Sequence, residues 1–320
     1  MNQFWGPGIA HSLILTANAP GIPRLFVGTS RAIVTPIGRI NAQLLYGKLT
    51  PSGYEPTVAK RDRFGSGLVA SWQPPSGRGF ELGLIRFYHR FWPDGGLRVA
   101  DLTVPFGSFF NDLQVYRGGP ADNQLVSVFA RLRGEESGFE VFGEFGRTDR
   151  AIDVRDLSLE PEQNSAWTIG AAKSMQDARG VLYLIRAEYA NGRISSIQRL
   201  ARGQATFYEH SPITQGHTQQ GQLLGTPLLE RTGGLEIGID RWAPWGRAGV
   251  TLIQRAMPSD LSESVSVQTA RSQWYTEANA VRFVGRNEVF ARTGVVLDLN
   301  RRPGSDEKNI YLQLGARYGW

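Results

Sequence analysis

The sequence has no cysteine and very little lysine. The lack of cysteine excludes a disulfide framework and thiolate chemistry. Only four of the 35 basic residues are lysine, so the positive charge is almost entirely guanidinium. Arginine binds carboxylates and phosphates through a planar fork and stays charged at any working pH. This bias favours acidic partners or internal ion-pair ladders. Because the arginines are spread along the chain rather than clustered, we expect no nucleic-acid partner.

Long apolar runs are also lacking. No uninterrupted apolar stretch reaches the roughly 18 residues that a membrane-spanning helix requires, and helical periodicity is hardly seen. Any membrane crossing therefore has to be made by a β-barrel. The first residues, MNQFWGPGIA, show no charged segment followed by an apolar stretch, so they contain no secretory signal. We expect that an exported form of this protein would begin upstream of Met1.

What the sequence does contain is alternation of apolar and polar side chains over segments of about ten residues. Examples are RINAQLLYG (39–47), FEVFGEFGR (139–147) and VLYLIRAEY (181–189). The last segment presents a wholly apolar face, made by Ile310, Leu312, Leu314, Ala316, Tyr318 and Trp320. An apolar stripe of period two that ends in aromatic residues is what a lipid-facing barrel strand needs.

The connections between these segments alternate in length. Short links fall at 34–38, 74–79, 133–138, 174–179, 243–246 and 285–287, and longer ones at 50–63, 91–122, 148–165, 191–232, 257–272 and 299–308. Outer-membrane barrels have short turns on the periplasmic side and long loops outside. We therefore predict an all-β fold, an antiparallel up-and-down transmembrane β-barrel with about twelve strands in this chain, forming a single domain over residues 1–320.

Charges of both signs recur on the polar faces of the segments. In a soluble β-sandwich, the alternative fold, these charges would lie outside and the loops at the two ends would be of comparable length. In a barrel they would either line a polysaccharide path or form cross-strand ion pairs that fill the lumen. The inward charges predicted by alternation are Arg131, Arg133, Glu140, Glu144, Arg186, Glu188, Glu236, Asp240, Arg255, Glu277, Arg282, Glu288, Arg292 and Arg317.

No catalytic constellation is visible. Glu140 and Glu144 stand about 13 Å apart on a strand, beyond the roughly 5 to 9.5 Å that glycosidase carboxylate pairs use. The sequence has no HExxH, P-loop or G-x-S-x-G motif, and its four histidines show no metal-site spacing. We therefore expect no enzyme activity, no metal and no cofactor.

Several long blocks resemble the capsule assembly Wzi family of outer-membrane β-barrel lectins. They are WGPG (5–8), HSLILTANAPGIPRLFVGTSR (11–31), TPIGRINAQLLYGKL (35–49), EVFGEFGRTDRAIDVRDLSLEPEQNSAWTIG (140–170) and HSPITQGHTQQGQLLG (210–225). The resemblance implies an 18-stranded barrel without an open pore, a helical element plugging one end, and an outer face that holds capsular polysaccharide. Family members carry a signal peptide, a helical bundle and first strands ahead of WGPG, which implies that this chain is truncated by about six strands.

Two loops are candidate polysaccharide contacts. In FYEHSPITQGHTQQG (207–221), Tyr208, His210 and His217 combine an aromatic face with neutral hydrogen-bonding groups, which suit sugar hydroxyls. The alternative is a loop that folds back to close the barrel mouth. The second loop is TDRAIDVRDLSLEPEQ (148–163), in which the candidate contacts to an acidic sugar are Arg150, Arg155 and Asp156.

The second loop and a further candidate contact, Trp5, each have a structural interpretation as well. The charges around Arg155 can instead form an Asp–Arg network that orders an outer loop. Trp5 can stack on a sugar ring or pack on the barrel rim. Taken together, the sequence predicts a monomeric, non-enzymatic lectin in the outer membrane of a Gram-negative bacterium. We expect it to contact outer-membrane lipid and to anchor an acidic capsular or surface polysaccharide in capsule assembly. The alternative is an outer-membrane porin or transporter for acidic saccharides, which would need an open lumen.

Overall fold

The computed structural model describes residues 3–52, 61–77, 79–106, 122–148, 158, 164–192, 207–209, 213–229, 233–257, 271–302 and 304–318. These residues build one 14-stranded antiparallel sheet and a small two-stranded one. Helical structure is scarce in the described ranges, which include α1 (Val99–Leu102), two 3-10 turns, η1 (Val104–Phe106) and η3 (Pro227–Leu229), and a helical residue at Ser158. No helix there is long and apolar enough to cross a membrane.

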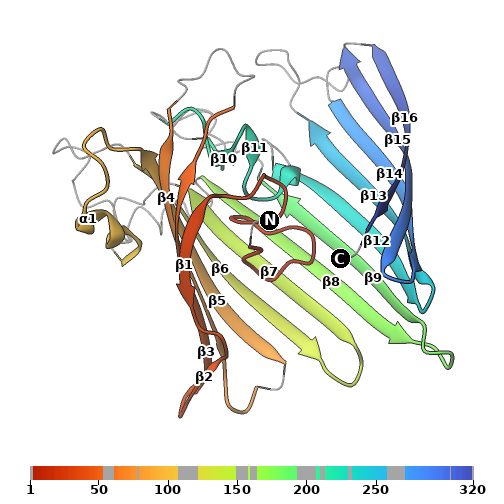
Figure 1. Cartoon of the computed structure of the whole chain (residues 1–320), viewed down its shortest axis with the longest axis horizontal. Coiled ribbons are helices and arrows are strands. Elements are labelled where there is room, and N and C mark those ends of the chain that lie inside the picture. Colours follow the sequence, from red (N-terminus) through yellow and green to blue (C-terminus); the bar gives the residue numbers. More distant parts are fainter. Residues whose placement is uncertain are drawn as a thin grey trace.

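Each long strand of the main sheet pairs with its neighbour in sequence, so the topology is up-and-down (Figure 1). The strands are β1 (Arg24–Gly28), β2 (Ile33–Thr35), β3 (Gly38–Leu49), β4 (Arg63–Gln73), β5 (Phe80–Phe91), β6 (Asp122–Gly134), β7 (Phe139–Thr148), β8 (Ser165–Gln176), β9 (Leu182–Asn191), β12 (Gly233–Ala243), β13 (Gly246–Met257), β14 (Arg271–Val284), β15 (Asn287–Arg302) and β16 (Ser305–Arg317). The small sheet pairs β10 (Thr218–Gln219) with β11 (Gln222–Leu223).

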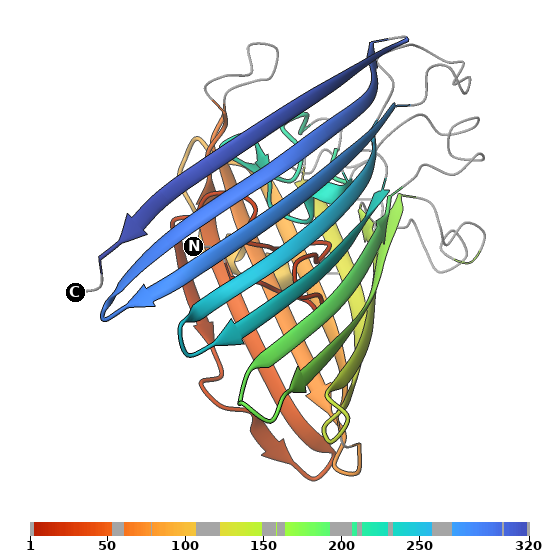
Figure 2. The same ribbon diagram turned by 90° about the vertical axis from the view of Figure 1, so that its right-hand side faces the viewer.

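The sheet curls like a barrel wall but does not close (Figures 1 and 2). Among the described strands, β1 and β2 pair with β3, and β16 pairs with β15, so the sheet keeps two edges. The predicted all-β, up-and-down antiparallel architecture and its twelve long strands are confirmed. The structure adds β1 and β2, which together extend the sheet by one broken strand. These two are short and separated by residues 29–32, so they lack the ten-residue alternation that revealed the others.

The prediction of one long loop is wrong. Residues 299–308 were expected to form a long connection, but β15 continues to Arg302 and β16 begins at Ser305. An irregularity in the strand register between Asp298 and Arg302 and a left-handed backbone at Asn300 (φ 56°) accommodate the bend. The Arg301 guanidinium pairs with Glu307 across the extended hairpin at 2.9 Å. The hairpin arms therefore extend through a region whose polar composition predicted a loop.

The two faces of the sheet have opposite chemistry. On the outer, convex face Leu312 and Leu314 are each 70% exposed, and Val250 is 51% exposed. On the inner face Glu144 and Glu188 are each 2% exposed. The predicted alternation of apolar and charged faces is therefore confirmed for these strands.

Arg282 is an exception among the charges that were predicted to face inward. Its partner in the β13–β14 ladder is Gly246, and the alternation that turns Glu277 and Asn279 inward places Arg282 in the outer row with Ala280. Arg282 lies at the end of β14 beside a short turn, where a long basic side chain can extend along the surface toward water.

Two segments outside the sheet occupy its concave side. The N-terminal segment (residues 3–23) lies there (Figure 1), and residues 207–209 and 213–229 pack against it. Trp5, Leu13 and Leu15 belong to one buried cluster with Phe87 of β5 and Leu228 of η3. We call these two segments the plug. Apart from the 3-10 turn η3, the described residues of the plug form irregular and short extended segments, whereas the family resemblance implied a helical element.

Candidate functional site

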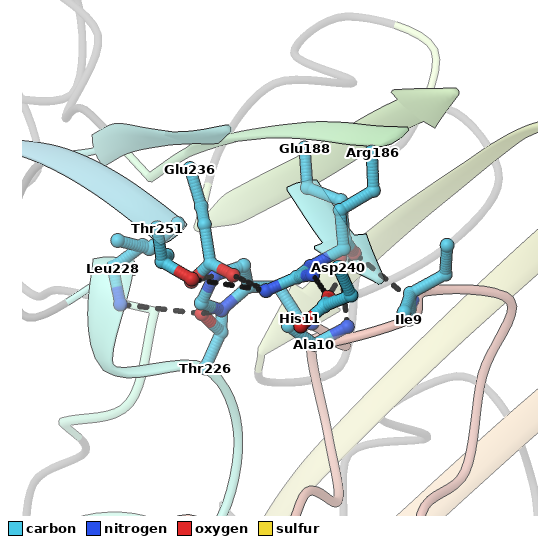
Figure 3. Close-up of polar contacts among 10 residues, drawn as sticks. All are labelled: Ile9, Ala10, His11, Arg186, Glu188, Thr226, Leu228, Glu236, Asp240 and Thr251. Atoms are coloured by element: carbon cyan, nitrogen blue, oxygen red, sulfur yellow. Dashed lines mark hydrogen bonds and ion pairs between the residues drawn. The ribbon is translucent and has the colours of Figure 1, made fainter. Parts of the chain in front are cut away.

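Three carboxylates from the inner wall hold the N-terminal segment of the plug. Glu188 of β9 accepts hydrogen bonds from the backbone N–H groups of Ile9 (3.1 Å), Ala10 (2.7 Å) and His11 (3.2 Å) (Figure 3). Three consecutive N–H groups that converge on one carboxylate make an anion-binding concavity of the kind backbones form around phosphates. The wall thus supplies the anion and the plug supplies the donors.

The second carboxylate, Glu236 of β12, lies directly opposite Glu188 in the β9–β12 ladder. The His11 imidazole donates from Nε2 to Glu236 Oε2 at 2.9 Å, and the Thr226 hydroxyl lies 2.8 Å from its Nδ1 (Figure 3). The Arg186 guanidinium also donates to Glu236, at 3.1 Å, and pairs with Asp240. His11 therefore ties both plug segments to the wall and separates two like charges that would otherwise repel.

Glu144 of β7 is the third carboxylate. It accepts from the Ser12 hydroxyl at 2.8 Å, the Leu13 backbone N–H at 3.0 Å and the Ser127 hydroxyl at 2.6 Å. The donors come from the plug and from β6, so the carboxylate is fully engaged in the interior. These hydrogen bonds satisfy the oxygens of a buried carboxyl group, which would otherwise be costly to keep away from water.

Arginines complete the inner wall. Arg131 donates to the Pro7 carbonyl at 2.6 Å and lies 3.3 Å from Glu140, which also pairs with Arg133 at 3.1 Å. Further along the sheet, Arg292 pairs with Glu277 and Arg271 with Asp298, at 3.2 and 2.7 Å. The cross-strand ion pairs that the charge pattern predicted are present. The sequence did not reveal that several of these charges also hold the plug.

The candidate residues Tyr208, His217 and Trp5 all lie in the interior, 3%, 0% and 3% exposed. The Tyr208 hydroxyl donates to the Leu13 carbonyl at 2.7 Å, and His217 Nε2 donates to the Ile14 carbonyl at 2.7 Å. Trp5 Nε1 donates to Gln43 at 3.0 Å. This placement is the one expected if the loop folds back into the barrel. Their contact with a sugar stays a prediction, and with this packing it would require the plug to move.

Burial also fixes the protonation of two of these groups. It raises the pKa of the Tyr208 hydroxyl well above its ordinary value and lowers the pKa of the His217 imidazole to about 4, although the hydrogen bond to Ile14 acts in the opposite direction. Both side chains are therefore neutral at physiological pH. They serve as hydrogen-bond donors to the backbone of the N-terminal segment.

The other four candidates cannot be placed. His210, Arg150, Arg155 and Asp156 lie outside the described residues, and their contact with polysaccharide stays a prediction. Within the described ranges, no group of three or more histidine, aspartate or glutamate side chains is placed to hold a metal ion.

No protein-family model matches the chain, and no curated protein matches it. A solved structure does: Wzi of Escherichia coli, described as an outer-membrane protein involved in group 1 capsule assembly and a carbohydrate-binding β-barrel. The TM-score is 0.66 and the sequence identity is 15%. The chain has a Wzi-like fold. The match covers 98% of this chain and 64% of the Wzi chain, so this chain spans less than two thirds of Wzi.

Within the Wzi-like fold, the inner wall at β14 to β16 carries a second polar cluster that sequence reasoning missed. The Tyr275 and Tyr311 hydroxyls each lie 2.5 Å from the same oxygen of Glu277, and their rings are stacked with centroids 6.0 Å apart. The ring of Tyr311 reaches Glu277 by lying over Gly294, where a Cβ would come within 2.6 Å of it. The strand register sets Gly294 of β15 between Glu277 of β14 and Tyr311 of β16. A glycine at that position is the one trace of the cluster in the sequence.

Proposed function

We propose that the protein is a non-enzymatic outer-membrane lectin that binds and anchors capsular or other surface polysaccharide. The observation that carries the proposal is the Wzi-like fold over 98% of the chain, because that neighbour is described as a carbohydrate-binding outer-membrane β-barrel of capsule assembly. The likeness is one of fold, so the residues that contact the polysaccharide have to be argued from this chain.

The chemistry of the two faces supports a place in the outer membrane. The convex face exposes apolar side chains along the strands, among them Leu312, Leu314 and Val250. Water disfavours an apolar surface of this extent, whereas hydrocarbon does not. The buried carboxylates of the concave face would be placed inside the barrel, away from lipid.

The plug supports binding rather than transport. The buried apolar cluster that includes Trp5 and Leu228 fills the concave side beside β3 to β9 and β12. A solute could pass there only if the plug left. A porin or transporter for acidic saccharides is the second candidate. The feature that favours it is the polar inner wall of β14 to β16, which carries Glu277, Arg292 and the exposed Gln313.

The carboxylates that would be needed for glycoside hydrolysis are already engaged. Glu140 pairs with Arg131 and Arg133, and Glu144 accepts hydrogen bonds from Ser12 and Leu13. A general acid has to reach the glycosidic oxygen of a substrate. This arrangement supports a binding role without catalysis.

Two measurements on the full chain in detergent or lipid test the proposal. The first is equilibrium binding of the purified surface polysaccharide of the source bacterium, and the second is conductance across planar bilayers containing the protein. A lectin binds the polysaccharide and gives no step-wise conductance. Step-wise conductance that acidic saccharides block would support the transporter, and the absence of any polysaccharide binding would refute the lectin.

A further inference from the structure

A hollow lined by arginines lies at the end of the sheet where β5 ends. It is formed by Arg61, just before β4, by the end of β5 and by the segment that leads from β5 to α1. Figure 1 labels β4, β5 and α1. Its volume is about 340 Å³, and a second hollow of about 400 Å³ adjoins it. The two share five lining residues, namely Arg61, Trp92, Pro93, Asp94 and Gly96. This size lies in the range of small-ligand sites.

The hollow is held open by a fixed ion pair. Asp101 of α1 pairs with Arg90 at the end of β5 and accepts a hydrogen bond from the backbone N–H of Arg98 at 2.7 Å. Burial opposes ionisation of Asp101, but the Arg98 hydrogen bond and the Arg90 charge outweigh it and hold the pKa of Asp101 below its usual value. The segment 92–98 is therefore closed into a loop with the side chain of Arg98 on its exposed surface.

The two other guanidinium groups of the hollow are held more loosely. Arg61 lies over the Phe91 ring at 4.6 Å and 3.6 Å from Asp94, whose side chain is 99% exposed, so the ion pair is worth little in water. Arg98 donates its backbone N–H to Asp101, and its exposed side chain adds positive charge near that carboxylate. Two exposed guanidinium groups thus line the hollow, ready to bind an incoming anion through forked hydrogen bonds.

An aromatic ring forms the adjoining wall. Trp92 is half-buried, and its backbone N–H donates to the Asp62 carbonyl at 2.9 Å. Phe64 packs edge-on against the indole at 6.2 Å, and the Lys48 ammonium lies 5.6 Å from the ring centroid. The ring is therefore fixed in orientation before any ligand arrives. A tryptophan beside a polar hollow offers an apolar surface for the C–H face of a sugar ring.

We propose that this hollow is a subsite for a uronic acid residue of the bound polysaccharide, with Arg61 and Arg98 on the carboxylate and Trp92 against the pyranose ring. The inference rests on the proposed lectin function and adds the class of sugar and its place. The aromatic wall favours a sugar over the phosphate of an outer-leaflet lipid, because a phosphate group alone would make no use of it.

The test uses the full chain in detergent micelles and two probes, a hexamer of glucuronic acid and a neutral hexamer of glucose with the same linkages, with affinities measured by calorimetry. Wild type is expected to prefer the acidic hexamer. Arg98→Ala and Trp92→Ala should each weaken that binding by about tenfold, as expected for loss of a charge-assisted contact or a buried ring contact. Arg286→Ala, which removes an exposed guanidinium from the short turn between β14 and β15, is the matched control and should leave it unchanged.

The outcomes separate this inference from the function on which it rests. Equal affinity for both hexamers, or wild-type affinity of the Arg98→Ala and Trp92→Ala proteins, would overturn the subsite while binding of the natural polysaccharide still supports the lectin. Wild-type protein that binds no surface polysaccharide at all would remove the lectin itself. Micelles of bisphosphorylated lipid A are a third probe, and tight binding of lipid A without binding of the acidic hexamer would assign the hollow to lipid instead.

Discussion

Glu188 and Glu236 stand directly opposite each other on β9 and β12, and His11 lies between them. Its backbone N–H donates to Glu188, and its imidazole donates to Glu236. Two like charges opposite one another destabilise a β-ladder unless donors separate them. The wall of the barrel and the N-terminal segment therefore depend on each other. The wall supplies carboxylate acceptors for the segment, and the segment supplies the hydrogen-bond donors that separate the two carboxylates.

Removal of the Glu188 carboxylate should loosen the plug. Glu188→Ala leaves one buried and two part-buried backbone N–H groups without this acceptor, which should lower the free energy of unfolding by about 3 kcal/mol. Urea unfolding in detergent micelles measures the loss, and limited proteolysis should cut the N-terminal segment first. Glu307→Ala, at an exposed ion pair with Arg301, is the control and should cost less than about 0.5 kcal/mol. Equal costs would mean that Glu188 does not anchor the plug.

The outer face can be tested on β16. Leu314 is 70% exposed on the convex side, and Gln313 lies in the inner row opposite Arg292. If the convex face contacts lipid, Leu314→Arg should cost about 2 to 4 kcal/mol near the bilayer midplane, whereas Gln313→Arg should be mild. Folding yield in lipid vesicles, read from heat-modifiable gel migration, gives the comparison. Equal sensitivity at the two positions would contradict the membrane assignment.

His217 predicts a pH dependence of stability. Its pKa is about 4 in the folded protein and about 6.5 when unfolded, so the unfolded chain binds more protons between these values. Stability should therefore be intact above pH 6.5 and fall as the pH drops to 4, by about 3 kcal/mol in total. Denaturant midpoints in micelles at pH 7, 5.5 and 4 measure it. His217→Gln keeps a donor for Ile14 and should flatten the profile, and a profile as steep as that of wild type would place the titration elsewhere.

The tyrosine cluster depends on a glycine. A Cβ at Gly294 would lie 2.6 Å from the ring of Tyr311, so Gly294→Ala should displace that ring from Glu277 and cost about 1 to 3 kcal/mol. Gly143 is also a strand glycine, but the nearest atom to its Cβ position is the Thr168 carbonyl oxygen at 3.5 Å. Gly143→Ala should therefore be neutral or slightly stabilising. Thermal unfolding of both variants tests the difference, and similar shifts would mean that the ring adapts freely.

The sequence predicted the strands well because their two faces meet different surroundings. Alternation over ten residues, as in FEVFGEFGR, carries that information locally, and the fold confirms it from β3 to β16. The hairpin at 299–308 was predicted wrongly because polar strand ends have the composition of a loop. Its cross-strand pair, Arg301 with Glu307, becomes visible only when the register is known.

The candidate site was less predictable because its contacts join distant parts of the chain. Tyr208 reaches Leu13 across 195 positions, and no local pattern encodes such a contact. Composition identified the 207–221 stretch as special but could not tell groups that bind sugar from groups that satisfy a buried backbone. A signal appears only once the register is known, because the register sets Glu188 opposite Glu236 and two opposed carboxylates require donors from elsewhere in the chain.

The long separation of the plug from its anchors sets an order of events. Every long strand pairs with the next long strand in sequence, so the sheet can grow hairpin by hairpin. The carboxylates that hold the N-terminal segment are much further away, because Glu144, Glu188 and Glu236 lie 131 to 225 positions further along the chain. Its binding site does not exist until β7, β9 and β12 stand side by side, and closing so long a loop has an entropic cost. The N-terminal segment can therefore reach its final place only after strands far along the chain have paired.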